Sequence, residues 1–230
     1  MRPQKYPTRH ALYEWLRREF RQDSIWQKGP YVVEEFVISD NSIEHSPSLE
    51  VFVDKKRHTI TYTCNQMVDQ EGRFIGVLMG KNCIKENIEM RIRKIGNIIG
   101  KRYAELGYRG FFDIDFITST DGKPYPIETN TRRTGGTHVF DFVHYMFGSN
   151  WHKKVVALSS DSFKYGNRIL SAKNILRKIE SVRFPMDNKK EGVIIAALSY
   201  NKPVFGFIIV GQNKKKAFGI YTKLNKIFSH

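Results

Sequence analysis

Residues 111–130 have the sequence FFDIDFITSTDGKPYPIETN, and this stretch decides the expected fold. Two runs of alternating apolar and polar residues flank the dipeptide Asp121-Gly122, which is typical of a tight hairpin turn. The pattern predicts two antiparallel strands, residues 111–117 and 124–130, joined at that turn.

Side chains alternate between the two faces of each expected strand. The apolar sets are Phe112, Ile114 and Phe116 in the first strand and Tyr125 and Ile127 in the second. Asp113 and Asp115 point to the face of the first strand opposite Phe112, Ile114 and Phe116. Antiparallel pairing across the turn should therefore bring Asp115, Glu128 and Asn130 together on one polar patch.

This patch has the composition of a magnesium site. Two neighbouring carboxylates repel each other unless a cation lies between them. Asp115 and Glu128, with the amide oxygen of Asn130, are the hard oxygen donors that suit Mg²⁺, which shares its other positions with phosphates and water. For either carboxylate alone, an ordinary solvated strand face is the simpler interpretation. The spacing of the whole polar string favours a binding site.

The hairpin continues into residues 131–138, TRRTGGTH. Arg132 follows Asn130 by two positions and should project from the same face, where its guanidinium could hold a phosphoryl group being transferred. Gly135 and Gly136 would let the backbone approach an anion closely.

The strongest helix signal covers residues 84–106, where apolar residues recur every three or four positions. Gly107 stands where a left-handed C-cap is expected. The remaining expected helices are residues 12–20, 172–179 and 215–228, and the remaining expected strands are residues 31–38, 48–54, 59–63, 192–199 and 204–210. We divide the chain into an N-terminal helical linker (1–30), a catalytic lobe (31–150) and an αβ extension of that lobe (151–230).

Composition sets the class of the protein. The chain has 230 residues, is 40% hydrophobic and carries 38 Lys and Arg against 23 Asp and Glu, a formal charge of +15. It has two cysteines, no sequence typical of a signal peptide, and a longest apolar run of seven residues, far below the ~20 that span a bilayer. We expect a cytoplasmic globular protein without a membrane partner.

Residues 107–117 and 121–132 resemble the magnesium-binding end of ATP-grasp ligases. The resemblance implies that Asp115, Glu128 and Asn130 hold the metal between the phosphates of ATP, and that Arg132 meets an acyl-phosphate. It also implies ATP and Mg²⁺ as cofactors, with Mn²⁺ as a substitute.

Residues 32–37, VVEEFV, resemble the hinge strand of the same family, which reads the adenine edge. The resemblance assigns adenine contacts to Glu34, Glu35 and the backbone of Val37. By itself this hexapeptide is more typical of a plain amphipathic strand.

Residues 133–138, RTGGTH, are similar to a segment of pheganomycin-type peptide ligases, in which two threonines stand where this chain has only Thr137. A lone histidine is more often structural, so His138 is given no catalytic role. The implied fold is α+β: the C-terminal lobe of ATP-grasp, an antiparallel sheet flanked by helices, without the N-terminal lobe and the domain before it.

The resemblance implies an ATP-dependent ligase that joins a carboxylate to an amine, either of them an amino acid or a peptide. Only about 30 residues precede Glu34, and Gly29 is their sole glycine, so a glycine-rich phosphate loop is missing. We therefore expect activity to need a partner chain that supplies the other lobe. The alternative is a non-catalytic basic module on the same scaffold that binds nucleic acid or another polyanion. No aromatic residues interleave with its lysine clusters, which disfavours single-stranded nucleic acid as partner.

Overall fold

The structure is a computed structural model that describes residues 6–22, 24, 28, 32–39, 46–55, 57–69, 73–184 and 190–229. The chain divides into two compact units, residues 1–38 and 39–230. The first unit contains helix α1 (Arg9–Gln22), whose first turn is capped by the Thr8 hydroxyl accepting from the Ala11 N–H at 3.1 Å. The helix expected around residues 12–20 is confirmed, and the domain boundaries expected after residues 30 and 150 stay predictions.

The strand expected over residues 31–38 is wrong across its described part. Residues 32–38 form no strand. The side chains of Val32, Val33 and Ile38 are exposed. An amphipathic pattern does not make a strand by itself, because a strand must also pair its backbone groups with a neighbour.

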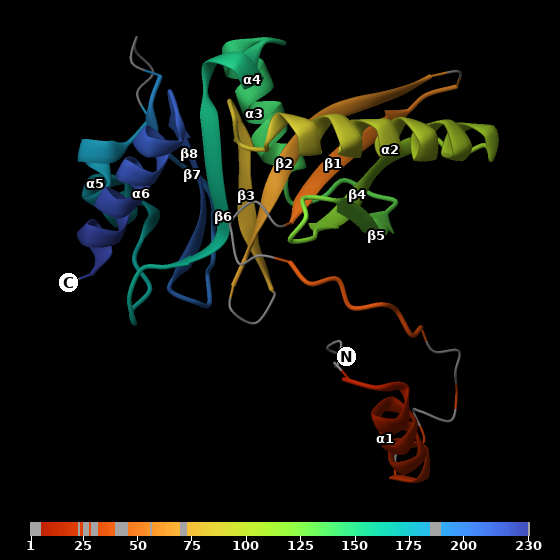
Figure 1. The fold of residues 1–230 in the computed structure, drawn as a ribbon. Helices are drawn as coiled ribbons and strands as arrows, with labels where there is room; N and C mark the ends of the chain where they lie inside the picture. The colour runs from red at the N-terminus through yellow and green to blue at the C-terminus, as the bar shows by residue number, and fades with distance from the viewer. Residues whose placement is uncertain are drawn as a thin grey trace. The chain divides into compact units, whose positions relative to one another are not determined.

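The second unit is built on one eight-stranded sheet of order β5-β4-β1-β2-β3-β6-β8-β7, in which every neighbouring pair is antiparallel (Figure 1). Its strands are β1 (Pro47–Val53), β2 (His58–Val68), β3 (Phe74–Gly80), β4 (Gly110–Thr118), β5 (Pro124–Asn130), β6 (Val156–Lys164), β7 (Gly192–Leu198) and β8 (Val204–Gly211). Its helices are α2 (Glu86–Glu105), α3 (Thr137–Phe147), α4 (Trp151–Lys154), α5 (Ala172–Lys178), the short 3₁₀ helix η3 (Glu180–Val182) and α6 (Lys214–Phe228). The α+β class and the antiparallel sheet flanked by helices are confirmed.

Helices cover both faces of the sheet. On one face α2 packs on β1 and β2, and α5 and α6 pack on the end of the sheet formed by β6, β8 and β7 (Figure 1). On the other face Cys64, Met79, Ala157 and Val210, which are register partners across four strands, pack against α3 and α4. The polar hairpin face lies on the part of that second face over β4 and β5, next to β1, where the first residue of α3 contacts Glu50.

Helix α2 fixes β1 and β4 from behind. Ile88 and Ile92 are buried among the apolar side chains of those strands, and Gly96 lies so close to Leu49 that an added Cβ would be 2.9 Å from its methyl groups. Gly107 follows the helix with φ +85°, which confirms the expected left-handed cap.

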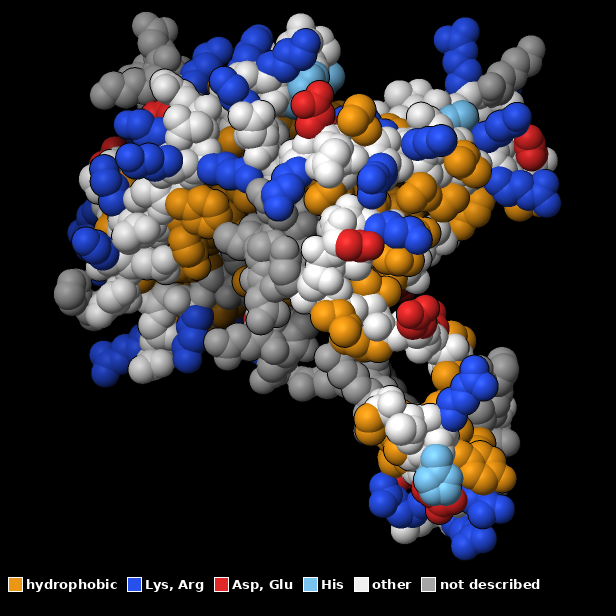
Figure 2. Space-filling view, viewed as in Figure 1, with side chains coloured by type: hydrophobic (Ala, Val, Ile, Leu, Met, Phe, Trp, Pro, Cys, Tyr) orange, Lys and Arg blue, Asp and Glu red, His pale blue; other side chains and the backbone are white. Residues whose placement is uncertain are grey.

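The excess of positive charge is dispersed. Figure 2 shows Lys and Arg side chains spread over the surface formed by α2, α5 and α6, with polar and apolar side chains between them. No helix of the described residues combines the length and apolar character needed to cross a membrane.

Packing of α2 gives a first prediction. Ile92→Ala should lower the free energy of unfolding by about 2–5 kcal/mol, because Ile92 is fully buried and its loss leaves a cavity under β4. Ile98→Ala on the same helix is the matched control, since Ile98 is 61% exposed and should cost less than about 1 kcal/mol. Urea unfolding followed by circular dichroism measures both; equal losses would contradict this packing.

Candidate functional site

The polar face of the hairpin lines a cavity of about 470 Å³ over β1, β2, β4 and β5. Six residues expected at the site line it: Asp115, Glu128, Asn130, Arg132, Gly135 and Gly136. Residues that line it without having been expected there include Ser48, Tyr62, Cys64, Gln66, Asp113, Thr134 and Asp161. The structure thus brings the expected metal ligands, the arginine and the glycine pair into one place.

The register of the hairpin sets the geometry. Asp115 lies directly opposite Glu128, and Asp113 lies opposite Asn130. The Asn130 Nδ2 group donates to Asp115 Oδ2 at 3.5 Å, and the Arg132 guanidinium donates to Asn130 Oδ1 at the same distance. Two carboxylates, an amide oxygen and a guanidinium are therefore within one side chain's length of each other.

A β-bulge corrects one detail of the expected pattern. Asp115 pairs with Glu128 but Phe116 pairs with Pro126, so Ile127 is an extra residue in the second strand. Tyr125 pairs with Ile117 and consequently lies on the same face as the carboxylates, not opposite them. The prediction that side chains alternate strictly along residues 124–130 is wrong, because the extra residue Ile127 shifts the alternation by one position.

Strand β2 supplies a residue that the sequence argument did not place at the site. Gln66 Nε2 donates to Asp115 Oδ1 at 2.6 Å, and Gln66 Oε1 accepts from the Ser46 hydroxyl at 3.1 Å. This chain of hydrogen bonds holds Oδ1 of Asp115, while its Oδ2 accepts from Asn130. Two signals in the sequence pointed to Gln66, its place in the order of the pheganomycin-type ligases and its period-two spacing from Tyr62 and Cys64, but neither specifies Asp115 as its partner.

Burial perturbs the acidic residues of β4. Burial, and then the neighbouring Asp115, raises the pKa of Asp113 to about 6. The pKa of Asp115 is also raised by burial, with Glu128 adding to the effect and bonds from Ser48 and Gln66 opposing it. Asp113 Oδ1 is buried without a hydrogen-bond partner. The cavity therefore concentrates negative charge that Arg132 offsets only in part.

The donor set fits a divalent cation that is shared with a ligand. No group of three or more His, Cys, Asp or Glu side chains in the described chain is arranged to hold a metal ion. A closed, all-protein metal centre is thus not what the described residues form. Two carboxylates and an amide oxygen suit Mg²⁺ that completes its coordination with phosphate oxygens and water.

A buried carboxylate anchors the loop after the hairpin. Glu50 is fully buried and accepts hydrogen bonds from the hydroxyls of Thr61 and Thr137, while Thr137 Oγ1 in turn accepts from the Thr134 N–H at 3.0 Å. Burial raises the pKa of Glu50, and the two threonine bonds oppose that rise. Thr137 therefore fixes the backbone around the glycine pair from below.

The glycine pair has a packing reason as well as an expected binding role. A Cβ on Gly135 would be 2.7 Å from the Phe74 ring, and one on Gly136 would be 2.6 Å from Tyr62 Oη. Tyr62 is itself stacked on Phe140, so it has little room to move. Close aromatic packing alone accounts for both glycines, and their contact with a phosphate stays a prediction.

The remaining expected residues are placed as follows. Glu34 and Glu35 are exposed and Val37 is half-buried, all three in the extended stretch of the first unit. His138 is exposed. Burial raises the pKa of Asp161, and the nearby His138 opposes that rise. Arg133, next to Arg132, is engaged by an ion pair with Asp141 at 2.9 Å and by the Phe111 ring.

Comparisons with known proteins agree with this architecture. No family model matches the chain. It is 25% identical over 132 residues to an L-propargylglycine–L-glutamate ligase of Streptantibioticus cattleyicolor, a match that covers 57% of this chain and 26% of that protein.

Among solved structures, an L-amino acid ligase from Bacillus licheniformis matches with a TM-score of 0.58 and 13% identity, over 98% of this chain and 63% of that one. The biotin carboxylase domain of the Hydrogenobacter thermophilus 2-oxoglutarate carboxylase, in complex with MgADP and bicarbonate, matches with a TM-score of 0.62 and 11% identity, over 94% and 52%. The chain is related to the ATP-grasp enzymes and has their fold. It spans about a quarter of the length of the curated relative and about half that of the solved structures.

The charge of the cavity gives a pH prediction. Asp113→Asn should raise the free energy of unfolding at pH 7.5, without divalent cations, by about 2 kcal/mol. The pKa of Asp113 is about 6 in the fold and about 3.9 in an unfolded chain. The wild-type chain therefore takes up a proton on folding between these values and loses stability as the pH rises through them.

Urea unfolding at pH 7.5 and below pH 4 measures the effect, and the gain should vanish at the lower pH. Asp121→Asn, at the exposed hairpin turn, is the control and should give no gain. A gain for Asp113→Asn that is equal at both pH values would show that shape, not charge, is responsible.

Proposed function

We propose that the chain carries the metal- and phosphate-binding part of an ATP-dependent ligase that joins a carboxylate to an amine. The observation that carries the proposal is the pairing of Asp115 with Glu128, beside Asn130 and Arg132, in one cavity. The shared fold supports nucleotide chemistry, and the curated relative, whose name describes the ligation of two amino acids, supports the reaction class.

The proposed reaction has two steps. A carboxylate oxygen attacks the γ-phosphorus of ATP, the β–γ bridging oxygen leaves with ADP, and an acyl-phosphate forms. An amine then attacks the acyl carbon, phosphate leaves, and the amine loses a proton. We assign Arg132 to the transferred phosphoryl group, because its guanidinium fork fits phosphate oxygens and it stands at the edge of the carboxylate cluster.

Asp115, Glu128 and Asn130 would hold Mg²⁺, or Mn²⁺ in its place, which when bound offsets the charge of the nucleotide phosphates. The reaction needs no protein nucleophile. Cys64 lines the cavity but is fully buried, and burial raises the pKa of its thiol well above the ordinary value, which keeps it protonated. Positioning and electrostatics by this chain's polar side chains are the proposed source of catalysis.

Three further assignments follow from the resemblance. Glu34, Glu35 and the backbone of Val37 would contact the adenine edge. Gly135 and Gly136 would face the phosphates from the loop that Thr137 anchors. The carboxylate and the amine would be amino acids or peptides.

We also propose that catalysis needs a second lobe that covers the phosphates from the other side, supplied by a partner chain. The proposal rests on the chain's coverage of the two solved structures described above, which is 52% and 63% of their length.

Metal-dependent nucleotide binding tests the assignment. With ATP and Mg²⁺ about tenfold above the dissociation constant, the melting temperature should rise by about 3–6 °C, corresponding to about 1.4 kcal/mol. The double variant Glu128→Ala with Asn130→Ala should lose this shift, because the cation then loses two of its three protein ligands. Scanning fluorimetry measures it.

The matched control is Glu105→Ala with Asn97→Ala, which removes the same side-chain types from the exposed surface of α2 and should keep the shift. Equal shifts in both double variants would contradict the metal site. A shift with single-stranded DNA but none with MgATP would favour the basic binding module instead.

Turnover tests the second lobe. The purified 230-residue chain should form little or no amide product from ATP and amino acids, because it supplies only one wall of the phosphate site. ADP release coupled to amide formation, followed by mass spectrometry, is the measurement. Sustained amide synthesis by the chain alone would contradict the requirement for a partner. It would not contradict the proposed metal site.

A further inference from the structure

Half of strand β2 has an open edge. β2 pairs with β1 along His58–Asn65 but with β3 only along Cys64–Val68. Residues 58–63 therefore have a neighbouring strand on one side alone. No backbone hydrogen bond from these residues to another part of the described chain covers the other side. A row of backbone donors and acceptors is thus available to an added strand.

The edge is open because β3 turns away from it. Gly80, at φ +108°, approaches β6 so closely that an added Cβ would be 2.2 Å from the Val155 carbonyl oxygen. The Lys81 N–H donates to that same oxygen, and Asn65 Nδ2 holds the Cys83 carbonyl at 2.5 Å. The turn after β3 is thereby pinned beside β6, which leaves a gap next to β2.

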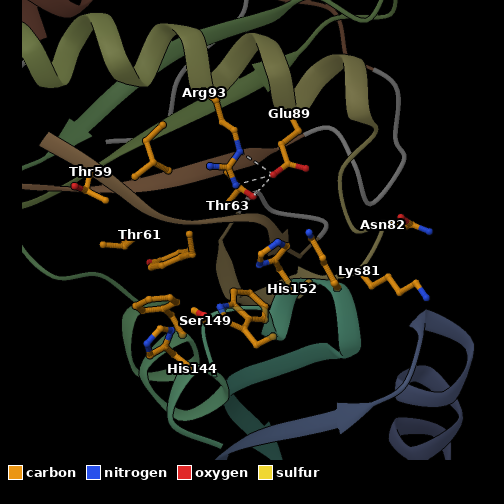
Figure 3. A pocket seen from close by; sticks show the side chains of 16 residues that line it. Thr59, Thr61, Thr63, Lys81, Asn82, Glu89, Arg93, His144, Ser149 and His152 are labelled. Carbon is orange, nitrogen blue, oxygen red and sulfur yellow. Dashed lines mark hydrogen bonds and ion pairs between the residues drawn. The ribbon is translucent and has the colours of Figure 1, made fainter. Parts of the chain in front are cut away.

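A pocket of about 650 Å³ occupies this gap, within the size range of ligand sites in proteins. Figure 3 shows Thr59, Thr61 and Thr63 along β2, with Arg93 and Glu89 of α2 on one side and His144 and His152 on the other. Phe140 adds an apolar surface to the wall formed by α3. The pocket lies apart from the carboxylate cavity, with which it shares only Tyr62.

The pocket is positively charged. Lys81, Arg93 and Lys153 line it, and Glu89 is its sole acidic residue among the described side chains. Glu89 is already engaged, since it accepts from Arg93 at 2.8 Å and from the Thr63 hydroxyl at 2.9 Å. Lys81 and Lys153 are exposed at the mouth. The charge is thus complementary to carboxylates.

We propose that the edge of β2 at residues 58–63 and this pocket bind an extended acidic peptide, which adds a strand to the sheet. Backbone pairing with β2 gives the peptide its orientation, and alternate side chains then point to opposite walls. Carboxylates on one side of the added strand reach Arg93 and Lys81, and apolar side chains on the other side reach Phe140. This site is independent of the proposed ligase chemistry.

Fluorescence anisotropy tests the site with a labelled hexapeptide of alternating Val and Glu. Two control peptides separate the contributions: one with the same sequence and charge but N-methylated at alternate residues, and one of alternating Val and Lys. The acidic peptide should bind at least tenfold more tightly than either, because N-methylation removes strand pairing and lysine reverses the charge. Hydrogen exchange of the amides in residues 59–63 should slow upon binding.

Protein variants complete the test. Lys81→Gln with Arg93→Gln should weaken binding of the acidic peptide at least tenfold, whereas Lys94→Gln with Lys101→Gln, an equal change of charge on the exposed surface of α2, should not. The proposal would be overturned by no binding at millimolar peptide, by equal affinity for the N-methylated peptide without slowed exchange, or by binding of an oligonucleotide in its place. Self-association that the Lys81 and Arg93 changes abolish would assign the edge to a second copy of the chain, and would overturn it as well.

Discussion

Mutual repulsion among the carboxylates of Asp113, Asp115 and Glu128, of which Asp113 is buried, Asp115 half-buried and Glu128 exposed, is the constraint on which the site depends. Asp113 and Asp115 point from β4 into one cavity, and Glu128 faces Asp115 from the next strand. The hydrogen bonds from Gln66 and Asn130 satisfy part of this charge, but one buried oxygen of Asp113 stays without a partner. Such an arrangement costs stability in the absence of a cation and becomes favourable with one.

The scaffold makes this cluster possible by anchoring β4 from its other face. Phe112, Ile114 and Phe116 are fully buried against α2, so the backbone of β4 cannot turn its aspartates toward water without exposing three large side chains. The loop beyond β5 is held in a similar way, by Glu50 through Thr137. Hydrophobic packing and one buried hydrogen-bond network therefore fix the polar residues of the cavity from below.

Local sequence signals were sufficient for the hairpin and for α2. The Asp-Gly turn, the alternation of β4 and the period of α2 each specify an element without long-range information, and all three are confirmed. The strands β3 and β6 were not predicted. Residues 74–80 are apolar without alternation, and residues 156–164 end in a polar stretch, so only pairing with neighbouring strands of the sheet defines them as strands. The stretch at residues 32–38 shows the reverse case, since its pattern is that of a strand but these residues form none.

Within the site, residues on a single hairpin were predictable, whereas residues that arrive from other strands were not. Gln66 and Glu50 belong to β2 and β1, and only tertiary structure brings them to Asp115 and Thr137. The bulge at Ile127 was equally invisible, because alternation carries no information about an inserted residue. The excess positive charge turned out to be dispersed over the surface that Figure 2 shows, with a smaller group of cations around the open edge of β2.

The central claim is that Asp115, Glu128 and Asn130 hold a divalent cation together with a nucleotide. The most direct measurement is paramagnetic broadening of backbone amide signals by Mn²⁺ in the presence of ADP, followed by NMR. Signals of residues 113–115 and 128–130 should broaden first, and excess Mg²⁺ should restore them. Broadening centred instead on His144 and His152, with the hairpin signals unchanged, would contradict the central claim.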